Sequence, residues 1–175
     1  MIDVAANPSD AVEKALDLFG NDILRLAYSY MKSREDAEDI VQEVLIRLMQ
    51  SAGEFEDESH EKAWLLKVAS NLCKDKLKSA SRQREVAIPE GYDVADEKQE
   101  QKEESDILQI ISQLPEKYRS AIHLYYYEEY SVKEIAEILE KKETTIRSLL
   151  KRGREKLARI LPQQMKGDDG HAAGI

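Results

Sequence analysis

The residues best suited to bind a polyanion lie in one segment, Ser131 to Arg159. Apolar residues recur there at helical spacing in two runs, and Ser131 stands where the N-cap of the first helix belongs. Thr144 or Thr145 can cap the second helix. Its apolar stripe is Ile146, Leu149, Leu150, Gly153 and Leu157, and its other face carries Arg147, Ser148, Lys151, Arg152 and Arg154. Such a helix suits the major groove of DNA, although a solvated charged helix has the same composition.

The distribution of charge favours nucleic-acid binding more than the total charge does. The chain is acidic overall, with a formal net charge of −9. Residues 141–160 nevertheless hold eight positive and two negative side chains, a local +6. Residues 62–84 hold seven positive and one negative, again +6. Two separate positive patches in an acidic chain indicate two contacts with one polyanion.

Composition excludes several other classes of protein. Charged residues make up 35% of the 175-residue chain and aromatic residues only 6%, so the core must rely on Leu, Ile, Val and Ala. The single cysteine, Cys73, excludes a disulfide framework and a cysteine-based zinc site, and no other cofactor is indicated. No run of about 18 apolar residues occurs, and the first residues are acidic. We therefore expect no membrane insertion, no signal peptide and a cytoplasmic location.

The spacing of apolar residues predicts an all-α protein made of two small helical domains. The expected domains cover residues 9–84 and 106–161. Residues 85–105 are rich in Glu, Gln and Lys and have the composition of a flexible acidic linker, and residues 162–175 that of a disordered tail. The helices are expected at 9–31, 34–51, 60–83, 106–113, 116–128, 132–139 and 145–161.

The second expected helix has an acidic face with an apolar centre. Its core side carries Ala37, Ile40, Val41, Val44, Leu45 and Leu48. The opposite side carries Asp39, Gln42 and Glu43, with Ile46 in their midst. An acidic rim around one apolar residue is typical of a helix that docks onto another protein, but single exposed apolar residues are also common. Composition alone leaves both interpretations open.

The third expected helix combines a core face with a basic outer face. Leu65, Val68, Ala69, Leu72 and Cys73 form the inner side. Lys67, Ser70, Asn71, Lys74, Lys78 and Ser81 share the outer side, with Trp64 and Arg82 at its edge. Lysines aligned with an amide and an aromatic ring suit a strand of nucleic acid. For Trp64 alone, a role as a core anchor is the simpler alternative.

Four segments together resemble one known family. They are DAEDIVQEVLIRLM, KAWLLKVASNLCKDKLK, LPEKYRSAIHLYYYEEYSVKEIAEIL and TTIRSLLKRGREKL. In this order, around an acidic linker, they look like a bacterial extracytoplasmic-function (ECF) sigma factor, a short member of the sigma-70 family. The resemblance covers about residues 15–160. It implies that the first domain is a sigma region 2 bundle, that the second is a region 4 helix-turn-helix, and that the protein directs core RNA polymerase to promoter DNA.

The resemblance also implies a role for each exposed face. The acidic face would dock onto the polymerase clamp coiled coil, the third helix would contact and open the −10 element, and the last helix would read the −35 element. The implied residues are, for polymerase, Asp39, Gln42, Glu43 and Ile46; for the −10 element, Asn71, Lys74, Lys78 and Arg82; and for the −35 element, Thr145, Arg147, Ser148, Lys151 and Arg152. Members of the family are often held inactive by an anti-sigma factor, but no residue here identifies one.

The chain departs from the family pattern in the turn of the helix-turn-helix. Glu140, Lys141 and Lys142 stand where glycine or small apolar residues are usual, and Thr144 replaces a frequent glycine. A non-glycine residue in a left-handed turn costs roughly 1 kcal/mol, so we expect these changes to affect the −35 sequence preference more than the fold.

A stand-alone helix-turn-helix regulator and an enzyme are the two alternatives to a sigma factor. A stand-alone helix-turn-helix regulator would usually need a dimerisation surface for paired half-sites, and no coiled-coil heptad supplies one. An enzyme is disfavoured because the three histidines are scattered and no glycine-rich phosphate loop occurs.

Overall fold

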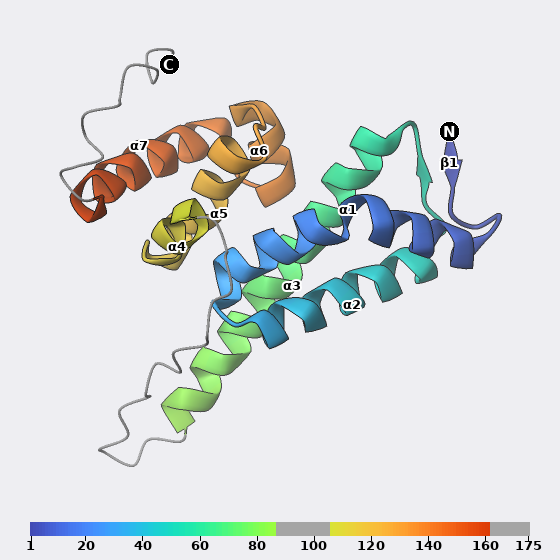
Figure 1. Cartoon of the computed structure of the whole chain (residues 1–175), viewed down its shortest axis with the longest axis horizontal. Helices are drawn as coiled ribbons and strands as arrows, with labels where there is room; N and C mark the ends of the chain where they lie inside the picture. Colours follow the sequence, from blue (N-terminus) through green and yellow to red (C-terminus); the bar gives the residue numbers. More distant parts are fainter. Residues whose placement is uncertain (87–105, 162–175) are drawn as a thin grey trace.

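The chain folds as an all-α protein in a computed structural model that describes residues 1–86 and 106–161 (Figure 1). The elements are β1 (Ile2–Asp3), α1 (Pro8–Met31), α2 (Arg34–Gln50), β2 (Glu54–Phe55), α3 (Glu58–Val86), α4 (Asp106–Ser112), α5 (Glu116–Ile122), η1 (His123–Tyr127), α6 (Val132–Leu139) and α7 (Glu143–Ile160). The expected helices are present with ends within a few residues of the prediction, except that the helix expected at 116–128 is divided into α5 and η1. We call residues 1–86 the N-terminal half and residues 106–161 the C-terminal half.

The N-terminal half is a bundle of α1, α2 and α3. Lys32 ends α1 in the left-handed region, with φ 57°, and its N–H donates to the Tyr28 carbonyl. Ser33 then caps α2, its hydroxyl accepting from the N–H of Asp36. This tight reversal lays α2 along α1. The predicted core face of α2 is confirmed, with Leu45 half-buried and the others buried: Ala37, Ile40, Val41, Val44 and Leu48.

A two-residue antiparallel pairing closes one end of this bundle, and the sequence did not predict it. Ile2 pairs with Phe55 and Asp3 with Glu54. Strands this short cannot show the alternation of apolar and polar residues by which strands are recognised. The pairing brings Phe55 into the core, where it is 3% exposed.

The inner face of α3 is wider than predicted. Leu65, Ala69 and Cys73 are fully buried as expected, and Val68 and Leu72 are half-buried. The prediction that Ser70 lies on the outer side is wrong. Ser70 is fully buried because its hydroxyl pairs with the Tyr30 hydroxyl of α1 at 2.8 Å, and a hydroxyl that finds a partner can be buried at little cost.

The C-terminal half contains a π-turn that the sequence did not predict. A single helix was expected over 116–128, but α5 widens into η1 after Ile122, and the Glu128 N–H donates to the His123 carbonyl at 3.2 Å. Glu129 follows with φ 59°. His123, the first residue of this widened turn, is completely buried.

The helix-turn-helix is formed by α6 and α7. Ser131 caps α6 as predicted, in a reciprocal capping box with Glu134. The prediction that Thr144 or Thr145 caps the next helix is wrong, because α7 begins at Glu143 with Lys142 at the N-cap and without a side-chain cap. The inner face of α7 is largely as expected: Ile146, Leu150 and Gly153 are buried, and Leu149 and Leu157 half-buried.

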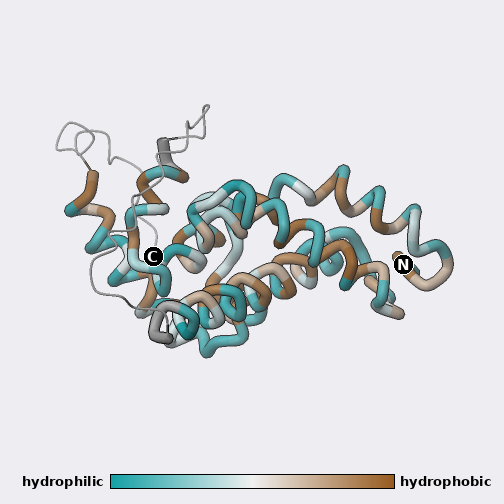
Figure 2. The backbone as a smooth tube through the Cα atoms, turned by 90° about the horizontal axis from the view of Figure 1, so that it is seen from below, coloured by the Kyte–Doolittle hydropathy of each residue, from teal (hydrophilic) through white to brown (hydrophobic). Residues whose placement is uncertain are grey.

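The two halves pack against each other. Helix α1 contacts α4, α5 and η1, and α3 contacts α6. One apolar cluster extends through both halves, and Figure 2 shows hydrophobic and hydrophilic residues alternating along the helices, as amphipathic elements require. The first two residues of the expected linker continue α3, whereas its remainder and the expected tail, 162–175, lie outside the described residues.

Gly153 lets α7 approach α5, and replacing it with alanine should destabilise the protein. A Cβ at Gly153 would lie 2.8 Å from two side-chain atoms of Ile122. Alanine gains about 1 kcal/mol over glycine in a helix, but overpacking costs roughly 1–3 kcal/mol. We expect Gly153→Ala to lower the melting temperature in thermal denaturation.

Gly20→Ala is the matched control, because Gly20 is also a buried glycine inside a helix. Its Cβ would come nearest to Leu16 Cδ1, at 3.0 Å, which is the end of a flexible and exposed side chain. This variant should gain up to about 1 kcal/mol. A Gly153→Ala protein as stable as the Gly20→Ala protein would contradict the packing of α7 described here.

Candidate nucleic-acid interface

The outer face of α7 is open to solvent. All five residues predicted to lie there are exposed: Thr145, Arg147, Ser148, Lys151 and Arg152. Arg147 is held by an ion pair with Glu143 one turn earlier, at 3.1 Å. The Ser148 hydroxyl donates to the Thr144 carbonyl at 3.1 Å. Because the opposite face is docked on α5, this face is free to enter a groove of a duplex.

The turn before α7 has the unusual backbone that its sequence implied. Glu140 ends α6 in the left-handed region, with φ 53° and ψ 44°. Its N–H donates to the Glu137 carbonyl at 3.4 Å, and the Lys141 N–H donates to the Ala136 carbonyl at 3.0 Å. Glutamate therefore occupies a conformation that favours glycine.

The outer face of α3 is only partly open. Lys78 and Arg82 are exposed, whereas Asn71 and Lys74 are half-buried. Asn71 Nδ2 donates to Glu140 Oε2 at 3.4 Å, and Lys74 Nζ donates to the Leu139 carbonyl at 3.4 Å. Burial lowers the pKa of Lys74, and nearby Lys141 lowers it further. Two of the four predicted −10 residues are thus engaged by the end of α6.

Trp64 has features of both a core anchor and a nucleic-acid contact. It is half-buried, and its ring packs on Phe55 with centroids 5.6 Å apart, as a core anchor would. It also lines a cavity of about 640 Å³ between the two halves. On the other wall of this cavity lie Tyr130, Glu134 and Glu137.

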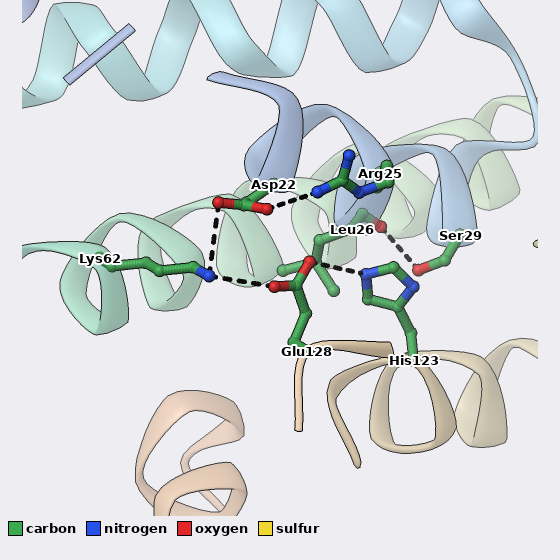
Figure 3. Close-up of polar contacts among 7 residues, drawn as sticks. All are labelled: Asp22, Arg25, Leu26, Ser29, Lys62, His123 and Glu128. Carbon is green, nitrogen blue, oxygen red and sulfur yellow. Dashed lines mark hydrogen bonds and ion pairs between the residues drawn. The ribbon is translucent and has the colours of Figure 1, made fainter. Parts of the chain in front are cut away.

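A buried polar cluster joins the two halves near this cavity (Figure 3). Lys62 Nζ of α3 lies 3.3 Å from Asp22 Oδ2 of α1 and 3.1 Å from Glu128 Oε2. The other oxygen of Glu128 lies 3.5 Å from Nε2 of the fully buried His123. Burial alone would raise the pKa of Glu128, but the nearby His123 and the hydrogen bond from Lys62 outweigh it and lower that pKa.

The acidic face of α2 lies outside all these contacts. Asp39, Gln42 and Ile46 are exposed, with Ile46 at 42%, and Glu43 is half-buried beside Arg47. Lys76 of α3 reaches the edge of this face, 2.8 Å from Asp36 and 3.8 Å from Asp39. Met49, which the sequence did not single out, is 48% exposed one turn after Ile46. Its position three residues beyond Ile46 could have indicated that both side chains lie on the same face of the helix.

Within residues 1–86 and 106–161, no group of His, Cys, Asp and Glu side chains could hold a metal ion. No helix in these ranges is long and apolar enough to cross a membrane.

Comparison with known proteins identifies both halves. The Sigma-70 region 2 family matches residues 16–83, and the Sigma-70, region 4 family matches residues 104–157. The chain is 31% identical over 173 residues to the ECF RNA polymerase sigma factor SigW of Bacillus subtilis, covering 90% of this chain and 92% of SigW. The chain belongs to the ECF RNA polymerase sigma factors. It is also 32% identical over 143 residues to SigE of Mycolicibacterium smegmatis, of which it spans 55%.

Two solved structures share the fold. The sigma factor RpoE of Bartonella quintana, crystallised with the anti-sigma factor NepR, superposes with a TM-score of 0.67 at 23% identity, over 89% of this chain and 97% of RpoE. CnrH, in complex with the cytosolic domain of CnrY, gives a TM-score of 0.62 at 18% identity, over 94% of each chain. The all-α fold predicted from sequence is confirmed.

The capping box of α6 should contribute measurably to the stability of this sigma factor. One of its two hydrogen bonds depends on the Ser131 side chain, whose hydroxyl accepts from the Glu134 N–H, and the other runs from the Ser131 backbone N–H to Glu134 Oε2. We expect Ser131→Ala to cost about 0.5–2 kcal/mol in chemical denaturation. Thr144→Ala is the control and should change stability by less than about 0.5 kcal/mol, because Thr144 is exposed and caps no helix. Equal losses in the two variants would mean that the threonine caps α7 in solution.

Proposed function

We propose that this ECF sigma factor binds core RNA polymerase and directs it to promoters, with no catalytic activity of its own. The observation that carries the proposal is the match to both sigma regions, in order, within a chain that aligns with SigW over nearly the whole length of both. The exposed faces of α2 and α7 support it, since they lie on different halves and differ in charge. One surface for a protein and another for DNA is what a specificity subunit requires.

Each face is assigned one partner. The acidic face of α2 docks on polymerase, and four exposed or half-buried residues supply the contact: Asp39, Gln42, Glu43 and Ile46. The outer face of α3 binds the −10 element through Trp64, Asn71, Lys74, Lys78 and Arg82. The outer face of α7 reads the −35 element through Thr145, Arg147, Ser148, Lys151 and Arg152. An anti-sigma factor is a further proposed partner, supported by the complex of the sigma factor RpoE with the anti-sigma factor NepR.

Ile46→Glu should abolish polymerase binding while leaving the fold intact. Ile46 faces away from the buried side of α2, so its replacement should change the free energy of unfolding by no more than about 0.5 kcal/mol. At the centre of an interface the same change buries an unpaired charge, which costs several kcal/mol of binding free energy. Co-purification with core polymerase and thermal denaturation measure the two effects.

Leu18→Glu is the control for that experiment. Leu18 is 45% exposed on α1, so the variant introduces the same charge at an equally exposed apolar position outside the acidic face. We expect it to bind polymerase as the wild type does. Retained binding by Ile46→Glu would show that Ile46 is an ordinary exposed residue, and lost helicity would show that the core of α2 lies on the other side.

Removing Arg147 or Arg152 should impair use of the upstream promoter element. If either guanidinium makes a bidentate contact with a guanine, its replacement by alanine costs roughly 1–3 kcal/mol at that sequence and leaves other promoters less affected. A phosphate contact would instead weaken all sequences alike and reduce the salt dependence of binding. Transcription from promoters with altered −35 elements separates the two cases.

Arg159→Ala is the matched control, because Arg159 is also an exposed arginine of α7 but lies in its last turn. We expect this variant to keep the promoter preference of the wild type. Unchanged transcription from every promoter by both Arg147→Ala and Arg152→Ala would refute the assignment of this face.

A further inference from the structure

The N-terminal strand holds the segment that joins α2 to α3. We call residues 51–57 the connecting loop. Ile2 of β1 pairs with Phe55 of this loop, and the Val4 N–H donates to the Gly53 carbonyl at 3.1 Å. Val4 is itself fully buried. The first residues of the chain are therefore bound to a loop that is distant in the sequence, through the backbone as well as through the core.

A tight turn fixes the path from β1 to α1. The carboxylate of Asp3 accepts from the N–H groups of Ala5, at 2.9 Å, and Ala6, at 3.2 Å. Aspartate commonly stabilises turns in this way, because its short side chain can bond to the backbone that follows it. Helix α1 packs against both α2 and α3, so the turn ties β1, and with it the connecting loop, to the rest of the bundle.

Phe55 of the connecting loop packs against two side chains of α3. Its ring meets the His60 ring edge-on, with centroids 5.6 Å apart, and the Trp64 ring at an angle of 57° and the same distance. A Cβ at Gly53 would lie only 3.3 Å from Cζ of Phe55, so the backbone of the loop is also close to this ring. Edge-on and tilted aromatic pairs are favourable beyond the area that they bury. The position of Phe55 therefore constrains that of Trp64.

Trp64 connects this contact to the proposed −10 surface. Lys67, Asn71 and Lys74 follow it at intervals of three or four residues, so the four side chains share one face of α3. Trp64 is half-buried, and its ring packs on Phe55. A ring that is already held in place loses little conformational freedom when a base stacks on it. The contact with Phe55 should therefore favour stacking.

We propose that β1 is a positioning element for −10 recognition: by pairing with the connecting loop it holds Phe55 against Trp64, and Phe55 fixes the Trp64 ring on the surface that meets the −10 element. Val4 and Phe55 are then positioning residues, which act on DNA only through Trp64. The inference rests on the proposed role of Trp64 in binding the −10 element. It adds residues 2–4 to the parts of the chain on which that binding depends.

The fluorescence of Trp64 tests the packing, because Trp64 is the only tryptophan in the chain. Val4→Pro removes the N–H that donates to Gly53, and Phe55→Leu removes the aromatic ring but keeps an apolar side chain. Both variants of the full chain are measured under conditions in which circular dichroism shows them folded. We expect the emission of Trp64 to shift to longer wavelength in both variants and its quenching by acrylamide to increase, since water and quencher reach a loosened ring more easily.

Val41→Ala is the matched control for the fluorescence measurements. Val41 is a buried residue of the same bundle, but it lies on α2 and takes no part in the β1–β2 pairing. Its truncation should lower the melting temperature, because it leaves a gap in the core, while the emission and quenching of Trp64 stay as in the wild type. If Val4→Pro and Phe55→Leu match Val41→Ala in both properties, β1 does not hold Trp64 and the proposal is wrong.

Holoenzyme binding tests the consequence for DNA. Two probes are made from a promoter that the wild-type holoenzyme uses, identical except that the −10 element is unpaired in one and paired in the other. Loss of folded protein lowers binding to both probes alike, so the ratio of the two affinities reports the contact with unpaired bases. With core polymerase, Val4→Pro and Phe55→Leu should reduce this ratio about two- to ten-fold, the contribution of an aromatic pair in its favoured geometry. Val41→Ala should leave the ratio unchanged.

Trp64→Leu separates the possible failures. It removes the ring itself and should reduce the ratio at least about five-fold, as the loss of stacking on one base does. If Trp64→Leu keeps the wild-type ratio, the proposed role of Trp64 in DNA binding is wrong. If Trp64→Leu loses the preference for the unpaired probe while Phe55→Leu keeps it, the role of Trp64 stands and the positioning inference fails. The inference also fails if Phe55→Leu loses the preference and Val4→Pro keeps it, because β1 is then not needed.

Discussion

The structure depends on one constraint: each helix has a single apolar stripe, and that stripe is buried where the helix packs against its neighbours. With aromatic residues at 6%, the core is built from aliphatic stripes at helical spacing, so burying one side of a helix fixes what its other side presents to solvent. Docking of Ile146 and Leu150 turns the basic side of α7 outward. Burial of Ile40 and Val44 turns the acidic side of α2 outward in the same way. The surfaces proposed to bind DNA and polymerase are therefore consequences of how the core is packed.

The junction between the halves is stabilised by a different combination of interactions. It combines an apolar cluster with ionised groups, among them Lys62 and Glu128, which are largely withdrawn from water. Replacing such a pair by apolar residues is often neutral or stabilising, so a buried ion pair is weak evidence for strong adhesion. The ion pair instead fixes one arrangement of the two halves. This arrangement can be undone, because water solvates both charged groups once the halves separate. A junction of this kind suits a protein whose two halves are each proposed to bind DNA.

The sequence predicted helix faces well and contacts between distant segments poorly. The core and solvent faces of α2, including the exposed position of Ile46, followed from helical periodicity alone. Ser70 was misplaced because its burial depends on a hydroxyl partner, Tyr30, forty residues away in the chain. The start of α7 was misplaced because a threonine at the end of a basic turn resembles a cap, although Lys142 takes that position. The role of Glu140 in joining the halves could not be read from its neighbours, because Lys67 and Asn71 lie on another helix. The roles assigned to individual residues on these faces remain predictions.

Transcription in vitro with purified core polymerase on a library of genomic fragments tests the central claim most directly. With this chain added, transcripts should begin at a limited set of positions that share an upstream and a downstream sequence element at fixed spacing, and none of these starts should occur with core polymerase alone. The same fragments should show no tight duplex binding by the chain without polymerase. Start sites that do not change when the chain is added, together with tight sequence-specific binding by the isolated protein, would contradict the account and identify a stand-alone regulator instead.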